Sequence, residues 1–309
     1  MNAGRQCHLR LALGQIRVEG GDVAGNLGRA AGAVEHARAG GAEMILLPEA
    51  LDCGWTDPSA AQLAEPIPEG GVCRKLAAFA HGAGIWVCAG LTEREGAAVY
   101  NSGVLLDPQG RVVLKHRKIH ELSLAHATYA MGDRLQVAET PWGRVGLMIC
   151  ADAFAPGQAI GRALGLMGSR LILSPCAWAV PEDHDPIQEP YGALWRENYG
   201  PVARDFRLWI AGCSQVGTIR GGDWAGRSCI GNSLVVGPDG STRWQGPYGF
   251  DAEMVMILDL EFPRRSPRGD LAGAEPTPET GGNRAAQLDC GWPLEEWFRP
   301  NAPSGAGST

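Results

Sequence analysis

The fold is decided by the stretch Val145-Gly146-Leu147-Met148-Ile149-Cys150-Ala151-Asp152. Mostly apolar residues lead into a cysteine, after which the chain turns polar. Because the breakers Pro141 and Gly143 precede the run, it predicts a buried β-strand over residues 144–149. A side chain at the carboxyl end of such a strand stands where an α/β sheet opens to ligands. Taken alone, the pattern favours a core cysteine, since a free thiol packs as a small hydrophobe.

The composition is that of a globular chain, with 309 residues, 45% hydrophobic and 20% charged. This length allows one large domain or two small ones. A net charge of -7 offers no basic surface, so we expect no nucleic-acid partner. The N-terminus has no apolar signal region, and no stretch approaches the roughly 20 apolar residues that span a bilayer. We therefore expect a cytoplasmic protein that does not bind membranes.

Cysteine usage agrees with that compartment. The chain has nine cysteines, an odd number without the spacing of a disulfide framework. Most lie in apolar runs, which is typical of reduced thiols in the cytosol. No Cys-x-x-Cys pair is present, so we expect no structural zinc site and no metal.

Strand-like and helix-like segments follow one another in two similar rounds. In the first round the expected strands are residues 9–16, 44–47, 85–91, 98–106 and 111–116, and the expected helices are 26–39 and 72–81. In the second round the expected strands are 144–149, 171–174, 208–214, 228–236 and 254–260, and the expected helices are 157–167 and 191–206. Each round ends in a hairpin-like segment with a Pro/Asp/Gly turn, at 107–110 and 238–240. The pattern predicts an internal pseudo-repeat of two αβ layers packed sheet to sheet.

The composition shifts at Pro263, where Gly, Pro, Ala and polar residues begin to dominate. We therefore expect one domain over residues 1–262 and a C-terminal extension over 263–309. Within the extension only residues 288–298 look able to pack, on another surface or on a partner subunit. The end, 300–309, is expected to be disordered.

A carboxylate follows the apolar run at residues 44–48. Pro48 cannot donate to a strand ladder and marks the end of the strand, so Glu49 stands where the strand opens. A partly desolvated carboxylate there would have a raised pKa and could act as a base. For a single glutamate, the commoner alternative is an exposed residue that opens a loop.

A basic cluster follows the next hairpin. Residues 112–114 are apolar, and residues 115–120 are rich in Lys, Arg and His. The cluster is either a solvated turn or the place where Lys118 stabilises negative charge that develops on a substrate oxygen. Together, Glu49, Lys118 and Cys150 supply the base, the cation and the nucleophile that thiol catalysis requires.

These three stretches carry a resemblance to a known family. LLPE at residues 46–49, RKIH at 117–120 and GLMICAD at 146–152 resemble the three signature stretches of the nitrilase superfamily, the carbon–nitrogen hydrolases. Their order is the family's and their spacings are similar. The resemblance runs from about residue 9 to residue 260, with further matching motifs at 14–16, 100–102, 132–133 and 236–240.

The resemblance implies an α/β fold, a four-layer α-β-β-α sandwich of two mixed sheets, which assembles as a homodimer or higher oligomer. It implies Glu49 as general base, Lys118 as oxyanion donor and Cys150 as nucleophile. The backbone N–H of Ala151 would complete the oxyanion hole. Attack on an amide or nitrile carbon would give a thioester, which water then hydrolyses, and no cofactor is implied.

The sequence departs from the family at two places. Many members have a second glutamate between the lysine and the cysteine, but residues 123–133 contain none. Either Glu121 or His126 fills the role, or the role is missing. Nitrile-cleaving members often place Trp and Glu after the nucleophile. Here Ala151 and Asp152 stand there, which is more similar to the amidase-like branches.

The substrate pocket is expected to be apolar and aromatic. Members that cleave N-carbamoyl amino acids often have an arginine soon after the cysteine, and here a carboxylate would need another clamp, Arg162 or Arg196. Trp55 and Trp178 follow strands next to the site and are candidates for the pocket wall, although either could belong to the core. The acidic segment 180–190 is either a lid or a solvated face.

The leading hypothesis is a thiol amidohydrolase that releases ammonia or an amine from a small, largely uncharged amide. Alternatives within the enzyme class are hydrolysis of nitriles or N-carbamoyl compounds, and acyl transfer to an amine. The alternative of a different class is a catalytically silent scaffold that binds a partner.

Overall fold

The computed structural model describes residues 7–262, which form two six-stranded sheets and one three-stranded sheet. The first sheet has the order β15-β1-β2-β3-β4-β5. Its strands are β1 (Cys7–Gln15), β2 (Met44–Leu46), β3 (Trp86–Glu95), β4 (Ala98–Leu106), β5 (Val112–Arg117) and β15 (Met254–Phe262). The second sheet has the order β14-β13-β10-β8-β7-β6. Its strands are β6 (Val137–Thr140), β7 (Gly143–Leu147), β8 (Leu171–Cys176), β10 (Trp209–Ser214), β13 (Leu234–Val236) and β14 (Thr242–Gln245).

The small sheet and the helices complete the fold. The small sheet has the order β11-β12-β9, with β9 (Ala179–Val180), β11 (Val216–Thr218) and β12 (Ser228–Ile230). The α-helices are α1 (Val23–Ala39), α2 (Ala60–Leu63), α3 (Gly71–Ala83), α4 (Ala159–Leu166) and α5 (Ala193–Phe206). Short 3₁₀ turns are η1 (Ser123–Ala127), η2 (Cys150–Phe154) and η3 (Pro156–Gln158).

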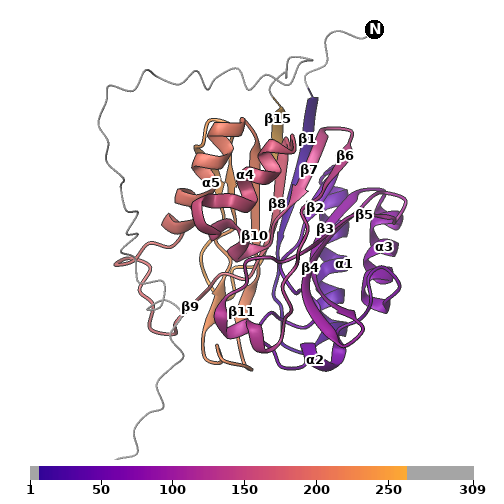
Figure 1. Ribbon diagram of the computed structural model, residues 1–309, viewed down its shortest axis with the longest axis vertical. Helices are drawn as coiled ribbons and strands as arrows, with labels where there is room; N and C mark the ends of the chain where they lie inside the picture. The colour runs from indigo at the N-terminus through magenta and orange to yellow at the C-terminus, as the bar shows by residue number, and fades with distance from the viewer. Residues whose placement is uncertain (1–6, 263–309) are drawn as a thin grey trace, which may run out of the picture. The chain divides into compact units, whose positions relative to one another are not determined.

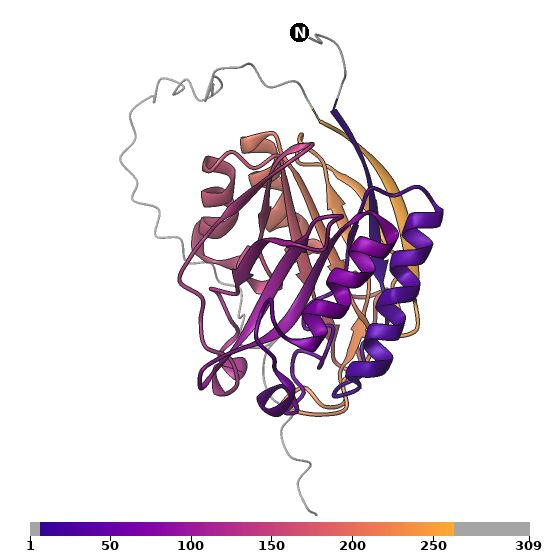
Figure 2. The same ribbon diagram turned by 90° about the vertical axis from the view of Figure 1, so that its right-hand side faces the viewer.

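The two large sheets lie face to face between two layers of helices. Helices α1 and α3 cover the outer face of the first sheet, and α4 and α5 cover the outer face of the second (Figures 1 and 2). This is the four-layer α-β-β-α sandwich of mixed sheets that the sequence predicts, and the fold prediction is confirmed.

The two sheets have the same pattern of strand directions. In the first, β1–β2 and β2–β3 are parallel and the other pairs antiparallel. In the second, β7–β8 and β8–β10 are parallel and the other pairs antiparallel. Each parallel pair is bridged by a connection that contains at least one α-helix, since parallel strands need a long crossover connection. The predicted pseudo-repeat is therefore present as a repeat of element types.

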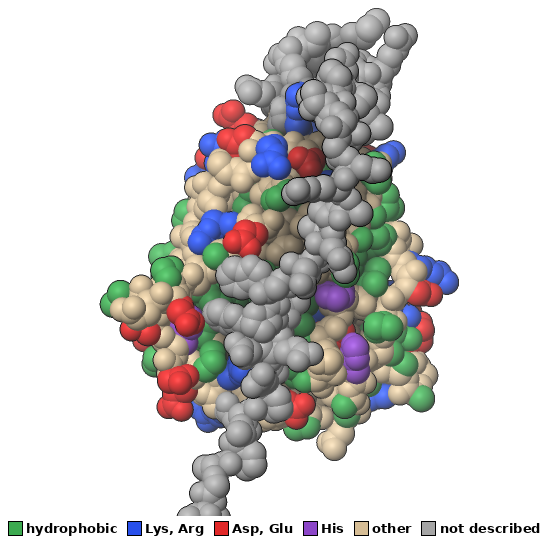
Figure 3. All heavy atoms as spheres, turned by 60° about the vertical axis from the view of Figure 1, so that its left-hand side comes forward, with side chains coloured by type: hydrophobic (Ala, Val, Ile, Leu, Met, Phe, Trp, Pro, Cys, Tyr) green, Lys and Arg blue, Asp and Glu red, His purple; other side chains and the backbone are tan. Residues whose placement is uncertain are grey.

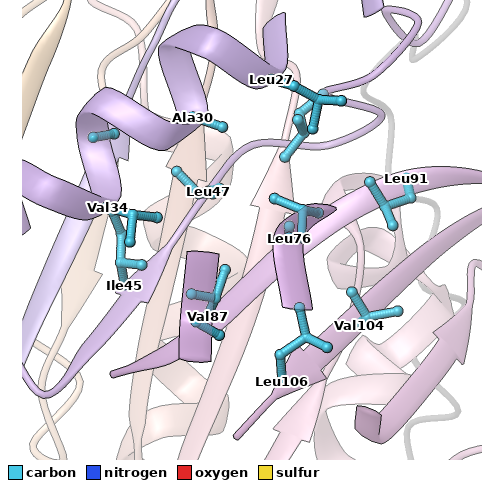
Figure 4. Packing of buried hydrophobic residues seen from close by; sticks show 14 of the residues in the cluster. Leu27, Ala30, Val34, Ile45, Leu47, Leu76, Val87, Leu91, Val104 and Leu106 are labelled. Atoms are coloured by element: carbon cyan, nitrogen blue, oxygen red, sulfur yellow. The ribbon is translucent and has the colours of Figure 1, made fainter. Parts of the chain in front are cut away.

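Side chains alternate between the two faces of each strand, and this alternation forms three apolar layers. In β1, Leu11 and Leu13 point between the sheets, whereas Ala12 points toward the helices. Figure 4 shows the layer beneath α1 and α3, in which Val34 of α1 lies next to Ile45 of β2. The layer beneath α4 and α5 includes the partly buried Cys150 and so reaches the predicted site.

Two strand predictions are corrected. The apolar run 228–236 was expected to be one strand, but it divides into β12 and β13, which belong to different sheets. The break falls at Gly231 and Asn232, which have φ values of 64° and 60°, so the chain turns there. The expected strand 144–149 ends at Leu147, and the following residues form the approach to the turn that contains Cys150.

Some expectations concern surfaces and termini. The extension 263–309, with its expected packing and disordered end, lies outside the described residues and stays a prediction. Within residues 7–262, no helix is long and apolar enough to cross a membrane. On the face drawn in Figure 3, acidic and basic side chains are interspersed where they are visible.

Candidate active site

Glu49 lies in a tight turn after β2, and its side chain is fully buried. The turn rests on β3, where the Gly90 N–H donates to the Pro48 carbonyl at 2.9 Å. A Cβ atom on Gly90 would lie 2.5 Å from the Glu49 Cα, so only glycine permits this approach. The predicted position of Glu49 at a strand end is therefore built by backbone contact with the neighbouring strand.

The two carboxylate oxygens of Glu49 have different surroundings. Oε1 accepts from Lys118 Nζ at 2.8 Å and from Asn101 Nδ2 at 2.7 Å. Oε2 is buried and has no hydrogen-bond partner among residues 7–262. Burial raises the pKa of Glu49, Lys118 opposes the rise and the charge of Glu121 adds to it. The arrangement orients the carboxyl group and leaves one oxygen available to take a proton.

Lys118 follows β5 directly and lies between two carboxylates. Its Nζ is 2.8 Å from Glu49 Oε1 and 2.7 Å from Glu121 Oε1, and all three side chains are buried. Burial alone would lower the pKa of Lys118, but Glu121 and Glu49 raise it well above its usual value. Lys118 is therefore a fixed ammonium group.

The place beside Lys118 that the sequence left open is occupied by Glu121. Asn101 Nδ2 also donates to Glu121 Oε2 at 3.2 Å, so one amide joins the two carboxylates. His126, the other candidate, is exposed in η1. The structure places Glu121, and not His126, in contact with the lysine.

Trp55 lies against the same ammonium group. Lys118 Nζ is 5.0 Å from the centroid of the Trp55 ring, within the range of a cation–π contact. The ring also meets Trp224 edge-on at 4.9 Å, and its backbone carbonyl accepts from the Tyr129 hydroxyl at 2.9 Å. Trp55 therefore lies against the lysine, while its contact with substrate stays a prediction.

Cys150 begins η2 with a φ of 44°, which a non-glycine residue rarely adopts. Its side chain is partly exposed, whereas Ala151 and Asp152 after it are buried. A backbone conformation of this kind is strained, and it persists only where several surrounding contacts hold it in place.

Asp152 supplies those contacts. Its Oδ2 accepts from the Ile149 N–H at 2.8 Å and lies 2.7 Å from His116 Nε2. Its Oδ1 accepts from the N–H groups of Ile119 and His120 at 3.0 and 2.8 Å. The carboxylate thus ties the turn of the cysteine to the residues that directly follow Lys118.

The electrostatics around Cys150 favour the neutral thiol. Burial raises its pKa most, and a hydrogen bond with Cys176 and the negative charge of Glu49 raise it further. Lys118 acts in the opposite direction. Since the thiolate is the reactive form of a cysteine, a thiol in these surroundings would need a base in order to react.

The other predicted residues have partners of their own. Trp178 is 1% exposed and stacks on Trp195 at 4.2 Å within the layer beneath α4 and α5. Arg162 forms an ion pair with Asp205, and Arg196 donates to Gln245. Neither arginine contacts the glutamate–lysine cluster in the contacts we describe.

Sequence reasoning did not assign two neighbours of the site. Asn101 is buried within β4, and its motif at 100–102 was noted without a role. Cys176 ends β8, in the stretch that leads to Trp178, and was given no role of its own. Their signal was weak because both lie within buried runs where polar function and packing look alike. Within residues 7–262, no group of three or more His, Cys, Asp or Glu side chains is arranged to hold a metal ion.

Comparison with known proteins identifies the family. The model of the family described as carbon-nitrogen hydrolase matches residues 10–265. The chain belongs to the carbon–nitrogen hydrolases. This family member is 30% identical over 250 residues to a nitrilase of Pyrococcus abyssi, covering 80% of this chain and 88% of the relative. It is 28% identical over 254 residues to an (R)-stereoselective amidase of a Pseudomonas species, covering 82% of this chain and 86% of the relative.

Among solved structures, the carbon–nitrogen hydrolase resembles an amidase of Nesterenkonia sp. AN1 from the nitrilase superfamily. In one form that amidase has the acetamide moiety of fluoroacetamide added covalently at its active-site cysteine. The likeness has a TM-score of 0.70 at 23% identity and covers 84% of this chain and 92% of the amidase. Another form of the same amidase is in complex with acrylamide. Relatives of this chain are thus amidases and nitrilases, and the structural likeness shows the shared fold.

Proposed function

We propose that the chain hydrolyses a small, largely uncharged amide with Cys150 as nucleophile, Glu49 as general base and Lys118 as oxyanion donor. The observation that carries the proposal is the geometry of Glu49. Its Oε1 is held by Lys118 and Asn101, while its buried Oε2 has no partner among the described residues. A base of this kind suits a neighbouring thiol whose pKa is raised.

In the first half-reaction, Glu49 takes the thiol proton as Cys150 Sγ attacks the amide carbon. Lys118 Nζ and the N–H of Ala151 stabilise the negative charge that develops on the carbonyl oxygen. When the tetrahedral intermediate collapses, Glu49 returns the proton to the leaving nitrogen. Ammonia or an amine departs, and the acyl group remains on Cys150 as a thioester.

In the second half-reaction, Glu49 removes a proton from water, which attacks the thioester carbon. The carboxylic acid then leaves, and the thiol is restored by the same proton. Glu121 holds the Lys118 ammonium group during both steps from 2.7 Å away. The cytoplasmic location remains a prediction. The homodimer or higher homo-oligomer is also a prediction, which light scattering can check.

The test is ammonia release from a panel of aliphatic and aromatic amides, nitriles and N-carbamoyl compounds. We expect release from amides by the native protein, and none by Cys150→Ala. Cys73→Ala, which removes a buried thiol of α3 away from the site, is the matched control and should retain activity. Release that persists in Cys150→Ala would exclude the thiol mechanism.

Hydrolysis of nitriles is the second candidate, because the Pyrococcus abyssi relative is a nitrilase. The two functions share the nucleophile and differ in the substrates of the panel that release ammonia. If no compound releases ammonia and mass spectrometry finds no adduct on Cys150, the silent scaffold becomes the better explanation.

A further inference from the structure

We infer that Cys150 and Cys176 form a reversible oxidation site, at which a hydroperoxide joins the two thiols in a disulfide. The site goes beyond the proposed hydrolysis and does not depend on it, because two neighbouring thiols can be oxidised whichever reaction Cys150 catalyses. Both cysteines are free thiols in the structure.

The two cysteines occupy opposite positions in the register of neighbouring strands. Strands β7 and β8 are parallel, Leu147 pairs with Leu173, and the Met148 N–H continues the ladder by donating to the Leu173 carbonyl at 3.2 Å. Three residues after this last pair, the same register places Cys150 opposite Cys176. Neighbouring strands lie about 4.8 Å apart, which is within the range of about 4.4–6.8 Å between Cα atoms that a disulfide spans.

The two side chains also lie on the same face of the sheet. Met148 and Ile172, which precede them on β7's extension and on β8, belong to the apolar layer beneath α4 and α5. Cys176 belongs to that layer, and Cys150 packs against it. The two thiols form a hydrogen bond with each other. Register, face and contact therefore agree that the sulfur atoms are neighbours.

The two thiols differ in their access to solvent. Cys150 is partly exposed, whereas Cys176 is fully buried. A dissolved oxidant therefore reaches Cys150 first, and Cys176 reacts with the group that has formed on its neighbour. Because burial raises the pKa of Cys150, its thiolate is a minor form at neutral pH, and we expect faster oxidation in mildly alkaline solution.

The chemistry takes place in two steps. The Cys150 thiolate attacks one oxygen of hydrogen peroxide, the O–O bond breaks, and a sulfenic acid forms while the released hydroxide takes up a proton. Cys176 Sγ then attacks the sulfur of Cys150, the S–O bond breaks, and a second water leaves with the thiol proton of Cys176. In total, two thiols are oxidised to one disulfide, and one hydrogen peroxide is reduced to two waters. A thiol reductant reverses the reaction by exchange.

Cys213 is a neighbouring thiol that should take no part. It lies on β10, the other neighbour of β8, where it pairs with Pro175. Its side chain is fully buried and belongs to the layer between the two large sheets, on the opposite face from Cys176. Cys213 is therefore the matched control for Cys176.

The experiment maps disulfides in the full-length protein after treatment with hydrogen peroxide at mildly alkaline pH. Free thiols are blocked with iodoacetamide, and the protein is digested with trypsin without reduction. Trypsin cleaves after arginine, so that Cys150 lies in the peptide 145–162 and Cys176 in the peptide 171–196. Mass spectrometry should find these two peptides linked, lighter by two hydrogen atoms than their sum, and dithiothreitol should separate them.

Variants test the part that each thiol plays. Cys176→Ala should give no linked peptides, and peroxide should carry its Cys150 on to the sulfinic acid, which dithiothreitol does not reduce. Cys213→Ala should give the linked peptides as the native protein does. If Cys176→Ala fails to fold, the peptide map of the native protein still decides.

The outcomes separate this inference from the proposed function. A native protein in which peroxide produces only sulfinic acid on Cys150, or links Cys150 to a second copy of the chain, would overturn the oxidation site and leave the proposed hydrolysis untouched. The linked peptides are detected without any substrate, so the oxidation site stands even if no amide is hydrolysed. Where an amide is hydrolysed, the linked protein should be at least about tenfold less active, since the disulfide occupies the sulfur, and dithiothreitol should restore the rate.

Discussion

The turns that contain Glu49 and Cys150 leave different sheets but are built alike. Each turn contains one residue in the left-handed backbone conformation. In the first turn it is Ala50, with a φ of 41°, and in the second it is Cys150, with a φ of 44°. Each also has a buried aspartate two residues after that position, Asp52 in one turn and Asp152 in the other. The two carboxyl groups nevertheless have opposite pKa shifts.

Their hydrogen-bond donors explain the difference. Asp52 is bound by uncharged groups, chiefly the N–H and hydroxyl of Thr92, and burial raises its pKa to about 6. Burial also raises the pKa of Asp152, but His116 and backbone N–H groups outweigh it and the pKa is lowered. Equal burial therefore yields a carboxyl group near neutrality in one turn and a firmly ionised one in the other.

The comparison also shows what each turn is attached to. Asp52 ties the turn of Glu49 to Thr92 of β3, within the same sheet. Asp152 lies in the turn of Cys150, which follows a strand of the second sheet. It binds the residues after Lys118, which follow β5 of the first sheet, and so connects the two sheets. We infer that the ionised aspartate sets Cys150, the proposed nucleophile, relative to Lys118, and that the Asp52 contact serves mainly the fold.

The largest effect is expected from replacing Glu49, the proposed base. Glu49→Gln should lower kcat/KM for amide hydrolysis by about 1000-fold or more, because an amide side chain cannot take the thiol proton. Initial rates of ammonia release measure this. Glu35→Gln, an exposed residue of α1, is the control and should be unchanged. A Glu49→Gln protein with activity within tenfold of the native value would show that another group is the base.

A smaller effect is expected from Asp152→Asn, at about 10- to 100-fold in kcat with less change in KM, since the turn loses an orienting charge. Stability should fall by about 1–3 kcal/mol at pH 7. Because the folded pKa lies below the ordinary 3.8, this contribution is present above pH 3.8 and is lost as the pH falls through the folded value. Urea unfolding at several pH values should show a deficit that shrinks toward acid; an equal deficit at all pH values would contradict the ionised state.

Replacing Glu121, the second glutamate that contacts Lys118, should have a moderate effect on kcat. Glu121→Gln should lower kcat by about tenfold, since Lys118 loses one of its two carboxylate partners. The matched change His126→Gln, on the exposed side of η1, should leave kcat unchanged. Steady-state kinetics of the two variants settle which residue supports the lysine, and equal losses in both would contradict the assignment to Glu121.

The smallest effect on activity is expected from Asp52→Asn, at most a few-fold in kcat. Its stability should show the opposite pH dependence to that of Asp152→Asn. The folded pKa of Asp52 is raised, so the stability that its protonated form contributes is present below pH 3.8 and is lost as the pH rises through about 6. Relative to the native protein, the variant should gain up to about 3 kcal/mol between pH 4 and pH 7 in urea unfolding. A difference that does not vary with pH would show that Asp52 is not near neutrality in the fold.

Much of the architecture could be predicted because local patterns reflect it. The 3.6-residue and 2-residue periods located the main helices and strands, and the order of elements predicted the repeat. The run 228–236 was wrongly predicted to be a single strand. Its apolar pattern indicates burial but does not indicate which sheet each part of the run joins. The short strands β9 and β11 were missed since two or three residues are too few to show a period.

The site divides in the same way. Glu49, Lys118 and Cys150 could be selected from sequence because each polar group lies at the end of a predicted strand, and because the three stretches resemble the family's. The choice between Glu121 and His126 could not, since it depends on which side chain the turn after Lys118 directs inward. Nor could Trp55 and Trp178 be separated, although the first lies against the lysine and the second is stacked in the core.

The sequence by itself determined the layers of the sandwich, the family and the candidates for base, cation and nucleophile, because these follow from local apolar patterns and short motifs. Only the tertiary structure decided that Glu121 contacts Lys118, that Glu49 keeps one unpaired oxygen among the described residues, and that Asp52 and Asp152 differ in pKa. Such properties depend on donors and charges brought together from distant parts of the chain. A one-dimensional pattern contains no measure of those distances.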